Sequence, residues 1–339
     1  MENILEIKDL KMDLMSTRGI VHTVRGVKMS VRNGEIHGIV GESGCGKSML
    51  VKSVMRLHDE KRSRYFGSVL LNGQEVLEIS KKEIQKLRGK EVSMIFQDPM
   101  NSLDPIMKVG KQIGEMLRKK EGMSKKQARE RAKKLLEQVG LEPVEERIDQ
   151  YPFEMSGGMM QRVMIAMAMA CRPKLLIADE PTTALDVTIQ KQILELIKRL
   201  RDKYGMACMI VTHNLGVVAE ICDTVSVMYA GQVVETASVQ DLFAHPMHPY
   251  TKALMASSPS KSNRGEKMVT IPGEPPKLYL ELKGCAFASR CPYATEYCKT
   301  HTPALQEVRK GQQAACFEIA EAKKARNEVA YGIRKRNCD

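Results

Sequence analysis

Apolar and polar positions alternate over residues 4–40 and again over 68–96. This pattern predicts β-strands, because successive side chains of a strand point to opposite faces of a sheet. The last strand of the first group, Ile36–Val40, ends in a glycine-rich loop. From Lys47 onward the apolar positions recur at helical spacing, so we expect a strand, a loop and a helix in direct succession.

Residues 106–150 have a different character, since they are rich in Lys, Arg and Glu. Within them, Ser124–Leu141 carries apolar side chains at helical spacing, and Ser124 with Gln127 fits the pattern of a capping box. We therefore expect an α-helical subdomain over about residues 100–165.

Short apolar strands then alternate with helical stretches. Strands are expected at Leu175–Ala178, Met209–Val211 and Val225–Met228, and helices near 185–203 and 214–221. Such alternation predicts an α/β fold, a mostly parallel sheet with helices on its faces.

Proline and glycine interrupt the pattern from about His245, and a cysteine-rich region follows over Cys285–Cys316. The length of 339 residues predicts about two domains. We expect a first domain over residues 1–250, a smaller cysteine-bearing module over 251–321 and a charged tail over 322–339.

The composition is that of a globular protein, with 43% hydrophobic residues and a net charge of +12. That charge would suit nucleic acid, but aromatic residues make up only 4%, which weakens any function that needs base stacking. The longest apolar stretch, Val163–Cys171, is well short of the ~20 residues that span a bilayer. The N-terminus lacks a signal-peptide pattern, so we expect a cytosolic chain that reaches a membrane only through partners.

The segment Gly41–Ser48 fits the pattern G-x-x-x-x-G-K-[ST] of a phosphate-binding loop, here called the P-loop. Glycines let backbone N–H groups surround phosphate oxygens, and the following helix adds its positive end. Lys47 is expected to reach the β- and γ-phosphates, and Ser48 to bind Mg²⁺. The predicted ATP-binding residues are Gly41, Ser43, Gly44, Cys45, Gly46, Lys47, Ser48 and Met49, with Cys45 contributing its backbone rather than its thiol.

Two acids, Asp179 and Glu180, follow the apolar strand Leu175–Ala178. Asp179 is expected to hold Mg²⁺ through water, and Glu180 to polarise the water that attacks the phosphate.

A serine and two glycines open another expected helix, at Ser156, Gly157 and Gly158. They form a second phosphate-binding helix terminus. One ATP does not need two such termini from one subunit, so these residues are expected to serve a nucleotide held by a partner.

At these motifs the chain resembles the ATP-binding-cassette (ABC) family. In that resemblance Gln97 corresponds to the loop glutamine that contacts Mg²⁺, and His213 to the histidine that contacts the γ-phosphate. Ala184, Leu185 and Asp186 correspond to a loop that crosses the dimer interface. The resemblance implies a P-loop NTPase cassette with a RecA-like core, an antiparallel β subdomain and the α-helical subdomain, in which ATP lies between two cassettes arranged head to tail.

Two departures accompany the resemblance. Met155 and Met159 stand where the family more generally has Leu and Gln, although Ser156 and both glycines are kept. The aromatic residue that stacks on adenine in the family has no clear counterpart, and Arg18 or His22 could pack on the base instead.

The segments FQDPMNSLDP, YPFEMSGGMMQR, HPMHPYTKALMASSP and IPGEPP narrow the resemblance to the ATPase subunits of oligopeptide/dipeptide importers, a group that includes nickel importers. Four cysteines follow at Cys285, Cys291, Cys298 and Cys316. Four thiolates suit Zn²⁺ or an iron–sulfur cluster, but the spacing is also compatible with four unrelated thiols. The resemblance implies a [4Fe–4S] cluster on these four, with Zn²⁺ as the alternative.

The resemblance also implies partners: two transmembrane permease subunits, a second, homologous ATPase subunit in a heterodimer, and an extracytoplasmic solute-binding protein. It places the chain peripherally at the cytoplasmic face of the cell (inner) membrane. Peptide as the cargo rests on the resemblance alone. The alternatives are a nickel or other small-solute importer, a regulatory cassette without turnover, and a nucleic-acid-linked ABC ATPase. A nucleic-acid-linked ABC ATPase would be favoured by sustained heptads or a second cassette. The sequence shows neither, so no nucleic-acid partner is expected.

Overall fold

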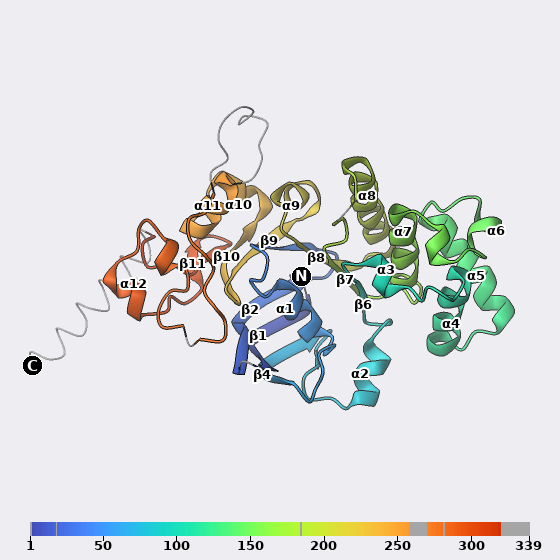
Figure 1. Cartoon of the computed structure of the whole chain (residues 1–339), viewed down its shortest axis with the longest axis horizontal. Helices are drawn as coiled ribbons and strands as arrows, with labels where there is room; N and C mark the ends of the chain where they lie inside the picture. Colours follow the sequence, from blue (N-terminus) through green and yellow to red (C-terminus); the bar gives the residue numbers. More distant parts are fainter. Residues whose placement is uncertain (1, 18, 184, 258–269, 281, 320–339) are drawn as a thin grey trace, which may run out of the picture.

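The computed structural model describes residues 2–17, 19–183, 185–257, 270–280 and 282–319, and every structural statement below concerns these. They form two β-sheets with helices around them (Figure 1). The strands are β1 (Asn3–Ser16), β2 (Gly19–Arg32), β3 (Ile36–Val40), β4 (Ser63–Leu71), β5 (Gln74–Glu75), β6 (Val92–Ile95), β7 (Leu175–Asp179), β8 (Ala207–Thr212), β9 (Thr224–Tyr229), β10 (Gln232–Ser238), β11 (Gln306–Arg309) and β12 (Gln312–Ala314). The α-helices are α1 (Lys47–Val54), α2 (Lys81–Leu87), α3 (Pro99–Ser102), α4 (Val109–Glu121), α5 (Lys125–Gln138), α6 (Val144–Arg147), α7 (Gly157–Ala168), α8 (Val187–Tyr204), α9 (Leu215–Ile221), α10 (Val239–Ala244), α11 (Pro249–Ala256) and α12 (Glu296–Thr300), and short 3₁₀ helices lie at η1 (Pro152–Glu154) and η3 (Ala288–Arg290).

The smaller sheet is antiparallel, in the order β2-β1-β4-β5. Alternate side chains of its strands, such as Leu5, Val27 and Val69, are fully buried and belong to one core with Leu50 and Val54 of α1. The alternation of apolar and polar positions therefore arises because only one face of this sheet is covered.

The larger sheet has the order β11-β12-β10-β9-β3-β8-β7-β6. Strands β9, β3, β8, β7 and β6 run parallel, so their carboxyl ends lie at one edge, as the alternation of strands and helices predicts. The α/β fold with an antiparallel β subdomain is confirmed. The antiparallel strands β10, β11 and β12 were not predicted.

Helices α3 to α7 form the predicted helical subdomain, which projects from the end of the large sheet that carries β6 (Figure 1). The capping box of α5 is confirmed: the Ser124 hydroxyl accepts from the Gln127 N–H at 3.3 Å, and the Gln127 side chain accepts from the Ser124 N–H at 3.0 Å. Within 68–96, expected to hold strands, the structure has helix α2, which starts with a capping box of Ser80 and Glu83.

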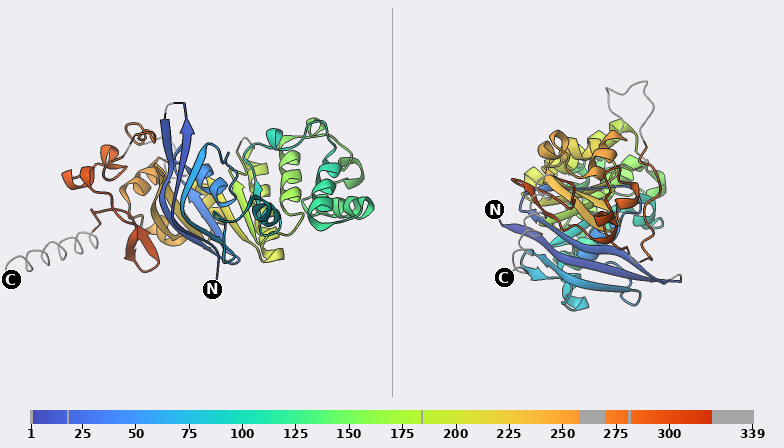
Figure 2. Two further views of the ribbon diagram at one scale, coloured as in Figure 1. Left: turned by 90° about the horizontal axis from the view of Figure 1, so that it is seen from below. Right: turned by 90° about the vertical axis from the view of Figure 1, so that its left-hand side faces the viewer.

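The C-terminal segment lies at the opposite end of the large sheet from the helical subdomain (Figure 2). It continues that sheet, because β12 pairs with β10. The carboxylate of Glu235 in β10 is fully buried and accepts from the N–H groups of Met247 and His248 and from the Gln312 side chain, each at 2.8 Å. The predicted charged tail 322–339 lies outside the described residues. Among the described helices, none combines the length and the apolar character that crossing a membrane requires.

Candidate functional site

The P-loop connects the carboxyl end of β3 to α1, at the edge where the parallel strands end. Two of its positions require glycine, because a side chain there would collide with neighbouring backbone, and at one of them the backbone conformation also favours glycine. A Cβ on Gly41 would lie 2.2 Å from the Met228 carbonyl oxygen, and one on Gly46 would lie 2.5 Å from that of Thr23. Gly46 also has a φ of 103°, which L side chains rarely adopt. The backbone can therefore curve tightly around a bound group, as a phosphate cradle requires.

Lys47 is buried and folds back over this loop. Its ammonium donates to the carbonyl oxygens of Gly41, at 2.7 Å, and Glu42, at 3.0 Å. Burial raises the pKa of the Cys45 thiol, so at neutral pH it stays protonated, in keeping with a backbone role for Cys45.

Ser48 and Asp179 meet across the gap between α1 and β7. The Ser48 hydroxyl donates to Oδ1 of Asp179 at 2.9 Å. Burial raises the pKa of Asp179, while the Ser48 hydrogen bond acts in the opposite direction. A hydroxyl and a carboxylate are oxygen ligands of the kind that Mg²⁺ prefers, so this pair suits the expected magnesium site.

Glu180 follows Asp179 and is the centre of a hydrogen-bond network. Its carboxylate accepts from the Gln97 amide at 3.0 Å and from the Thr183 hydroxyl at 2.8 Å, and it lies 3.3 Å from Nδ1 of His213. The backbone of Glu180 has a φ of 48°, a conformation that costs free energy for any residue other than glycine and that concentrates at functional sites. Three predicted site residues, Gln97, Glu180 and His213, are thus brought together.

Thr183 was missed by the sequence analysis. The signal in the sequence was its position three residues after Glu180. In the structure the two residues form a turn, in which the Thr183 N–H donates to the Glu180 carbonyl at 3.2 Å. A threonine in such a turn can reach back to the side chain that precedes it.

Ser156, Gly157 and Gly158 lie at the N-terminus of α7, where the Ser156 hydroxyl accepts from the Met159 N–H at 3.4 Å. Helix α7 is grouped with α4 to α6, apart from α1 (Figure 1). A Cβ on Gly158 would lie 2.9 Å from Cγ2 of Ile189 in α8, so this glycine lets the two helices approach.

Asp186 caps helix α8, since its carboxylate accepts from the Ile189 N–H at 2.9 Å. Leu185 packs near Gly157, at 3.6 Å from the position of an added Cβ. Ala184 lies outside the described residues. The expected interface loop and the Ser-Gly-Gly element therefore form one continuous surface of this chain.

The two methionines that depart from the family pattern have separate places. Met155 is buried in the core that the helical subdomain shares with α8 and one face of the large sheet, and Met159 is partly buried against the same core. Of the residues expected to pack on adenine, Arg18 lies outside the described residues. His22 is partly exposed and its Nδ1 lies 2.7 Å from Oδ1 of Asp13.

The four C-terminal cysteines line one small cavity of about 20 Å³. Burial raises the pKa of Cys285 and Cys291, and raises that of Cys316 to about 11. Across the described residues, no group of three or more His, Cys, Asp or Glu side chains is placed to hold a metal ion. The four expected ligands are therefore brought to one place, but the expected metal site at them is not supported by the structure.

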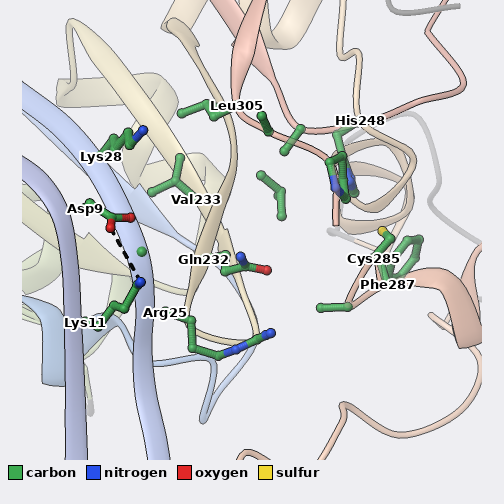
Figure 3. A pocket seen from close by; sticks show the side chains of 16 residues that line it. Asp9, Lys11, Arg25, Lys28, Gln232, Val233, His248, Cys285, Phe287 and Leu305 are labelled. Carbon is green, nitrogen blue, oxygen red and sulfur yellow. Dashed lines mark ion pairs between the residues drawn. The ribbon is translucent and has the colours of Figure 1, made fainter. Parts of the chain in front are cut away.

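A larger cavity of about 290 Å³ lies between β2, part of β10 and the C-terminal segment (Figure 3). Arg25, Lys11 and Lys28 project toward it from the small sheet, while Cys285 and Phe287 lie on the opposite wall. The Arg25 guanidinium is bonded to the Ala230 carbonyl oxygen at 3.1 Å. This cavity therefore marks the junction between the cassette and the segment that carries the cysteines.

Comparison with known proteins agrees with this geometry. Residues 24–183 match the ABC transporter family, and residues 234–298 match the oligopeptide/dipeptide transporter C-terminal region. The chain is 48% identical over 320 residues to the probable peptide ABC transporter ATP-binding protein y4tR of Sinorhizobium fredii, with 94% of this chain and 96% of that protein covered. It is 53% identical over 294 residues to the oligopeptide transport ATP-binding protein OppD of Bacillus subtilis, covering 86% and 82%.

It is also 47% identical over 313 residues to the dipeptide transport ATP-binding protein DppD of Escherichia coli, covering 92% of this chain and 96% of that protein. The fold is similar to that of the dimeric ATP-binding cassette MJ0796 in a post-hydrolysis state with ADP and phosphate, with a TM-score of 0.62, 26% identity, and coverage of 69% of this chain and 98% of that chain. The chain therefore belongs to the ABC transporter ATPases, among the ATP-binding subunits of the oligopeptide/dipeptide group.

Proposed function

We propose that this subunit hydrolyses ATP to power the import of di- and oligopeptides through a multi-subunit ABC transporter. One observation carries the catalytic part: the Glu180 carboxylate stands next to the Ser48–Asp179 pair and is surrounded by Gln97, Thr183 and His213. The peptide cargo is supported by the names of the relatives, all of which are peptide, oligopeptide or dipeptide transport proteins.

In the proposed mechanism, the P-loop amides and Lys47 bind the β- and γ-phosphates, and Lys47 exchanges the carbonyl oxygens of Gly41 and Glu42 for phosphate oxygens. Ser48 and Asp179 would hold Mg²⁺, which would neutralise charge on the phosphates when bound. Glu180 orients a water in line with the γ-phosphorus and accepts its proton, as the bond from that phosphorus to the bridging oxygen breaks. His213 and Gln97 keep the Glu180 carboxylate in place and face the γ-phosphate.

The Ser156–Gly158 element would act on the nucleotide of a second ATPase subunit. Ser156 and Gly157 are exposed at the start of α7, so they can face another chain. Asp186 and Leu185 extend the same surface. We propose a heterodimer in which each site takes its P-loop and acids from one cassette and its Ser-Gly-Gly element from the other.

The permease contact is proposed for the helical subdomain near Gln97. Three large apolar side chains of this region are exposed: Met100 at 61%, Ile106 at 86% and Phe153 at 69%. Met100 follows Gln97 closely in the chain, and the Gln97 amide donates to Glu180, so a permease subunit bound there would be coupled to the proposed catalytic carboxylate. This contact would hold the chain at the cytoplasmic face of the membrane, with a solute-binding protein on the other side.

We also propose that Cys285, Cys291, Cys298 and Cys316 bind a [4Fe–4S] cluster. Four thiols that line one cavity are the donor set that such a cluster uses. The cavity has room for little more than one water, so the loops that carry the cysteines must move apart to admit the cluster.

The function is tested by Glu180→Gln in the transporter assembled with its permeases and binding protein. We expect kcat for ATP to fall by about 10²-fold or more, with ATP binding kept, because only the proton acceptor is lost. Glu195→Gln, an exposed carboxylate on α8, is the matched control and should behave like the parent. Unchanged turnover in Glu180→Gln would overturn the catalytic assignment, and a failure of peptide to stimulate ATP hydrolysis would overturn the cargo.

A further inference from the structure

A residue of the P-loop is held by a residue of the C-terminal segment. The carboxylate of Glu42 accepts two hydrogen bonds from the Arg290 guanidinium, at 2.7 Å and 3.0 Å, across 248 residues of sequence. The Arg290 side chain is only 3% exposed, and that of Glu42 is 25% exposed. A two-point contact between a planar guanidinium and a carboxylate fixes orientation as well as distance.

The rest of the Arg290 guanidinium is also fully engaged. It donates to the carbonyl oxygens of Pro272, at 2.9 Å, and Ile271, at 3.2 Å, and to the Tyr229 hydroxyl at 3.2 Å. The arginine is therefore fixed between β9 and the C-terminal segment before it reaches Glu42, so the Glu42 carboxylate is bound to a rigid support.

The backbone of Glu42 is held from the same side. Its N–H donates to the Tyr250 hydroxyl at 2.8 Å. Tyr250 packs against Tyr229 and Phe287, with ring centroids 4.6 Å and 5.4 Å away. Phe287 points into the junction together with Cys285 (Figure 3).

Both anchors from the C-terminal segment, Phe287 and Arg290, belong to the short loop between Cys285 and Cys291. That loop carries two of the four cysteines, and Arg290 directly precedes Cys291. The cysteine-bearing segment thus reaches the phosphate-binding loop through one ion pair and one aromatic cluster.

We propose that Arg290 is a positioning residue for nucleotide binding, which acts through Glu42 to hold the first turn of the P-loop in its phosphate-binding shape. A P-loop binds phosphate through several backbone N–H groups at once, so small displacements of its first turn weaken all of them together. The affinity for ATP then depends on the Cys285–Cys291 loop, which itself never touches the nucleotide. This inference rests on the proposed role of the P-loop in ATP binding.

The test compares Arg290→Met, Glu42→Gln and the double variant in the full-length chain and in the assembled transporter. Equilibrium ATP affinity, KM for ATP, kcat and the melting temperature without nucleotide are measured for each. We expect either single variant to weaken ATP binding and raise KM by about tenfold, with kcat at saturating ATP changed less than about twofold. The double variant should be no weaker than the worse single variant, because the two residues act as one unit.

Arg290→Lys keeps the charge but loses the two-point contact, so it should fall between the parent and Arg290→Met. Lys299→Met is the matched control, since Lys299 is an exposed cation of the same segment that pairs with Glu296. It should leave affinity and KM unchanged.

Additive losses in the double variant, or a lower melting temperature with unchanged affinity and KM, would overturn the proposal. Should Arg290→Met fail to fold, Glu42→Gln alone decides, and an unchanged affinity there overturns it. Lys47→Ala separates this inference from the proposed function. If Lys47→Ala still binds ATP normally, the proposed site is wrong; if it loses ATP while Glu42→Gln does not, only the role of Arg290 is wrong.

Discussion

The Ser48 hydroxyl donates a hydrogen bond to Oδ1 of Asp179 at 2.9 Å, joining the start of α1 to the end of β7. The two residues are 131 positions apart in the chain, and the parallel order of β3, β8 and β7 brings them together. The pair marks where phosphate and Mg²⁺ would meet the carboxylate of Glu180, the proposed proton acceptor.

Asp179→Asn should lower the rate of ATP hydrolysis but raise the melting temperature of the nucleotide-free protein. Loss of the carboxylate should lower Mg²⁺-dependent kcat by about 10²-fold or more, because the metal loses an anionic ligand. Burial raises the pKa of Asp179, so the folded protein binds a proton there more readily than the unfolded chain does. As the pH rises from the pKa of the unfolded chain through the raised pKa of the folded protein, Asp179 ionises and the free energy of unfolding falls.

The nucleotide-free Asp179→Asn variant should accordingly melt at a higher temperature than the parent near pH 7, and the difference should shrink as pH falls. Thermal unfolding between pH 4 and pH 8 measures this. A lower melting temperature for Asp179→Asn than for the parent at neutral pH would contradict this prediction, because it would show that the surroundings stabilise the ionised carboxylate.

His213→Ala should reduce turnover and leave ATP affinity nearly unchanged. The imidazole lies 3.3 Å from Glu180, so its loss removes one group that keeps the carboxylate oriented. We expect a fall in kcat of about 10²-fold in the assembled transporter. His245→Ala, at the end of α10, is the control. Equal kcat for both variants would remove His213 from the site.

Gly158→Ala should impair the contact with a second cassette for a steric reason. The added Cβ would lie 2.9 Å from Cγ2 of Ile189, so α7 or α8 must move. ATP-dependent dimerisation with the second ATPase subunit, measured by light scattering with Glu180→Gln to prevent turnover, should weaken at least about tenfold. The double change Gly158→Ala with Ile189→Ala relieves the clash and should restore most of the affinity.

No recovery in that double variant would mean that the added methyl group meets the partner subunit directly rather than Ile189. An unaffected dimer in Gly158→Ala alone would contradict the proposed placement of the Ser156–Gly158 element at the contact between the two cassettes.

The proposed cluster predicts iron and sulfide in protein purified without oxygen. Cys285→Ser should lose both, whereas Cys171→Ser should keep both, because Cys171 follows α7 and is not among the residues that line the cavity of the four cysteines. Elemental analysis and the absorbance of the cluster provide the measurement. A preparation without iron, with Cys285→Ser indistinguishable from the parent, would sink the proposal.

Glu235→Ala should destabilise the junction of the cassette and the C-terminal segment. Three donors, from Met247, His248 and Gln312, would be left without their acceptor in a fully buried place. We expect a loss of about 2–5 kcal/mol in the free energy of unfolding. Urea denaturation measures it, and Glu195→Ala, at an exposed position of α8, should change it by less than about 0.5 kcal/mol.

The sequence predicts this fold well where local chemistry sets it. The strand-loop-helix at Ile36–Lys47 and the helix from Ser124 follow from side-chain period, glycines and capping residues, all of which act over a few positions. Helix α2 was missed although Ser80 and Glu83 carry the same capping signal, because the surrounding alternation favoured strands.

Other features depend on contacts that no local pattern encodes. β12 pairs with β10 across about 75 intervening residues, and Arg290 meets Glu42 across 248. The left-handed backbone of Glu180 and its three side-chain neighbours likewise arise only when β7 and β8 and the loop after β6 come together. The residues proposed as catalytic were identified from their motifs, whereas the contact of Arg290 with Glu42 behind the P-loop could not be predicted from the sequence.

Strands β11 and β12 have a further consequence for the free chain. β10 would otherwise be the outermost strand of the large sheet on that side, with open N–H and C=O groups along its edge. The C-terminal segment covers that edge with a short two-stranded ribbon whose outer strand is polar at Gln306, Glu307 and Arg309. This cover leaves fewer open N–H and C=O groups on β10 to pair with the sheet of another molecule, which lowers the tendency of the free chain to aggregate through that edge.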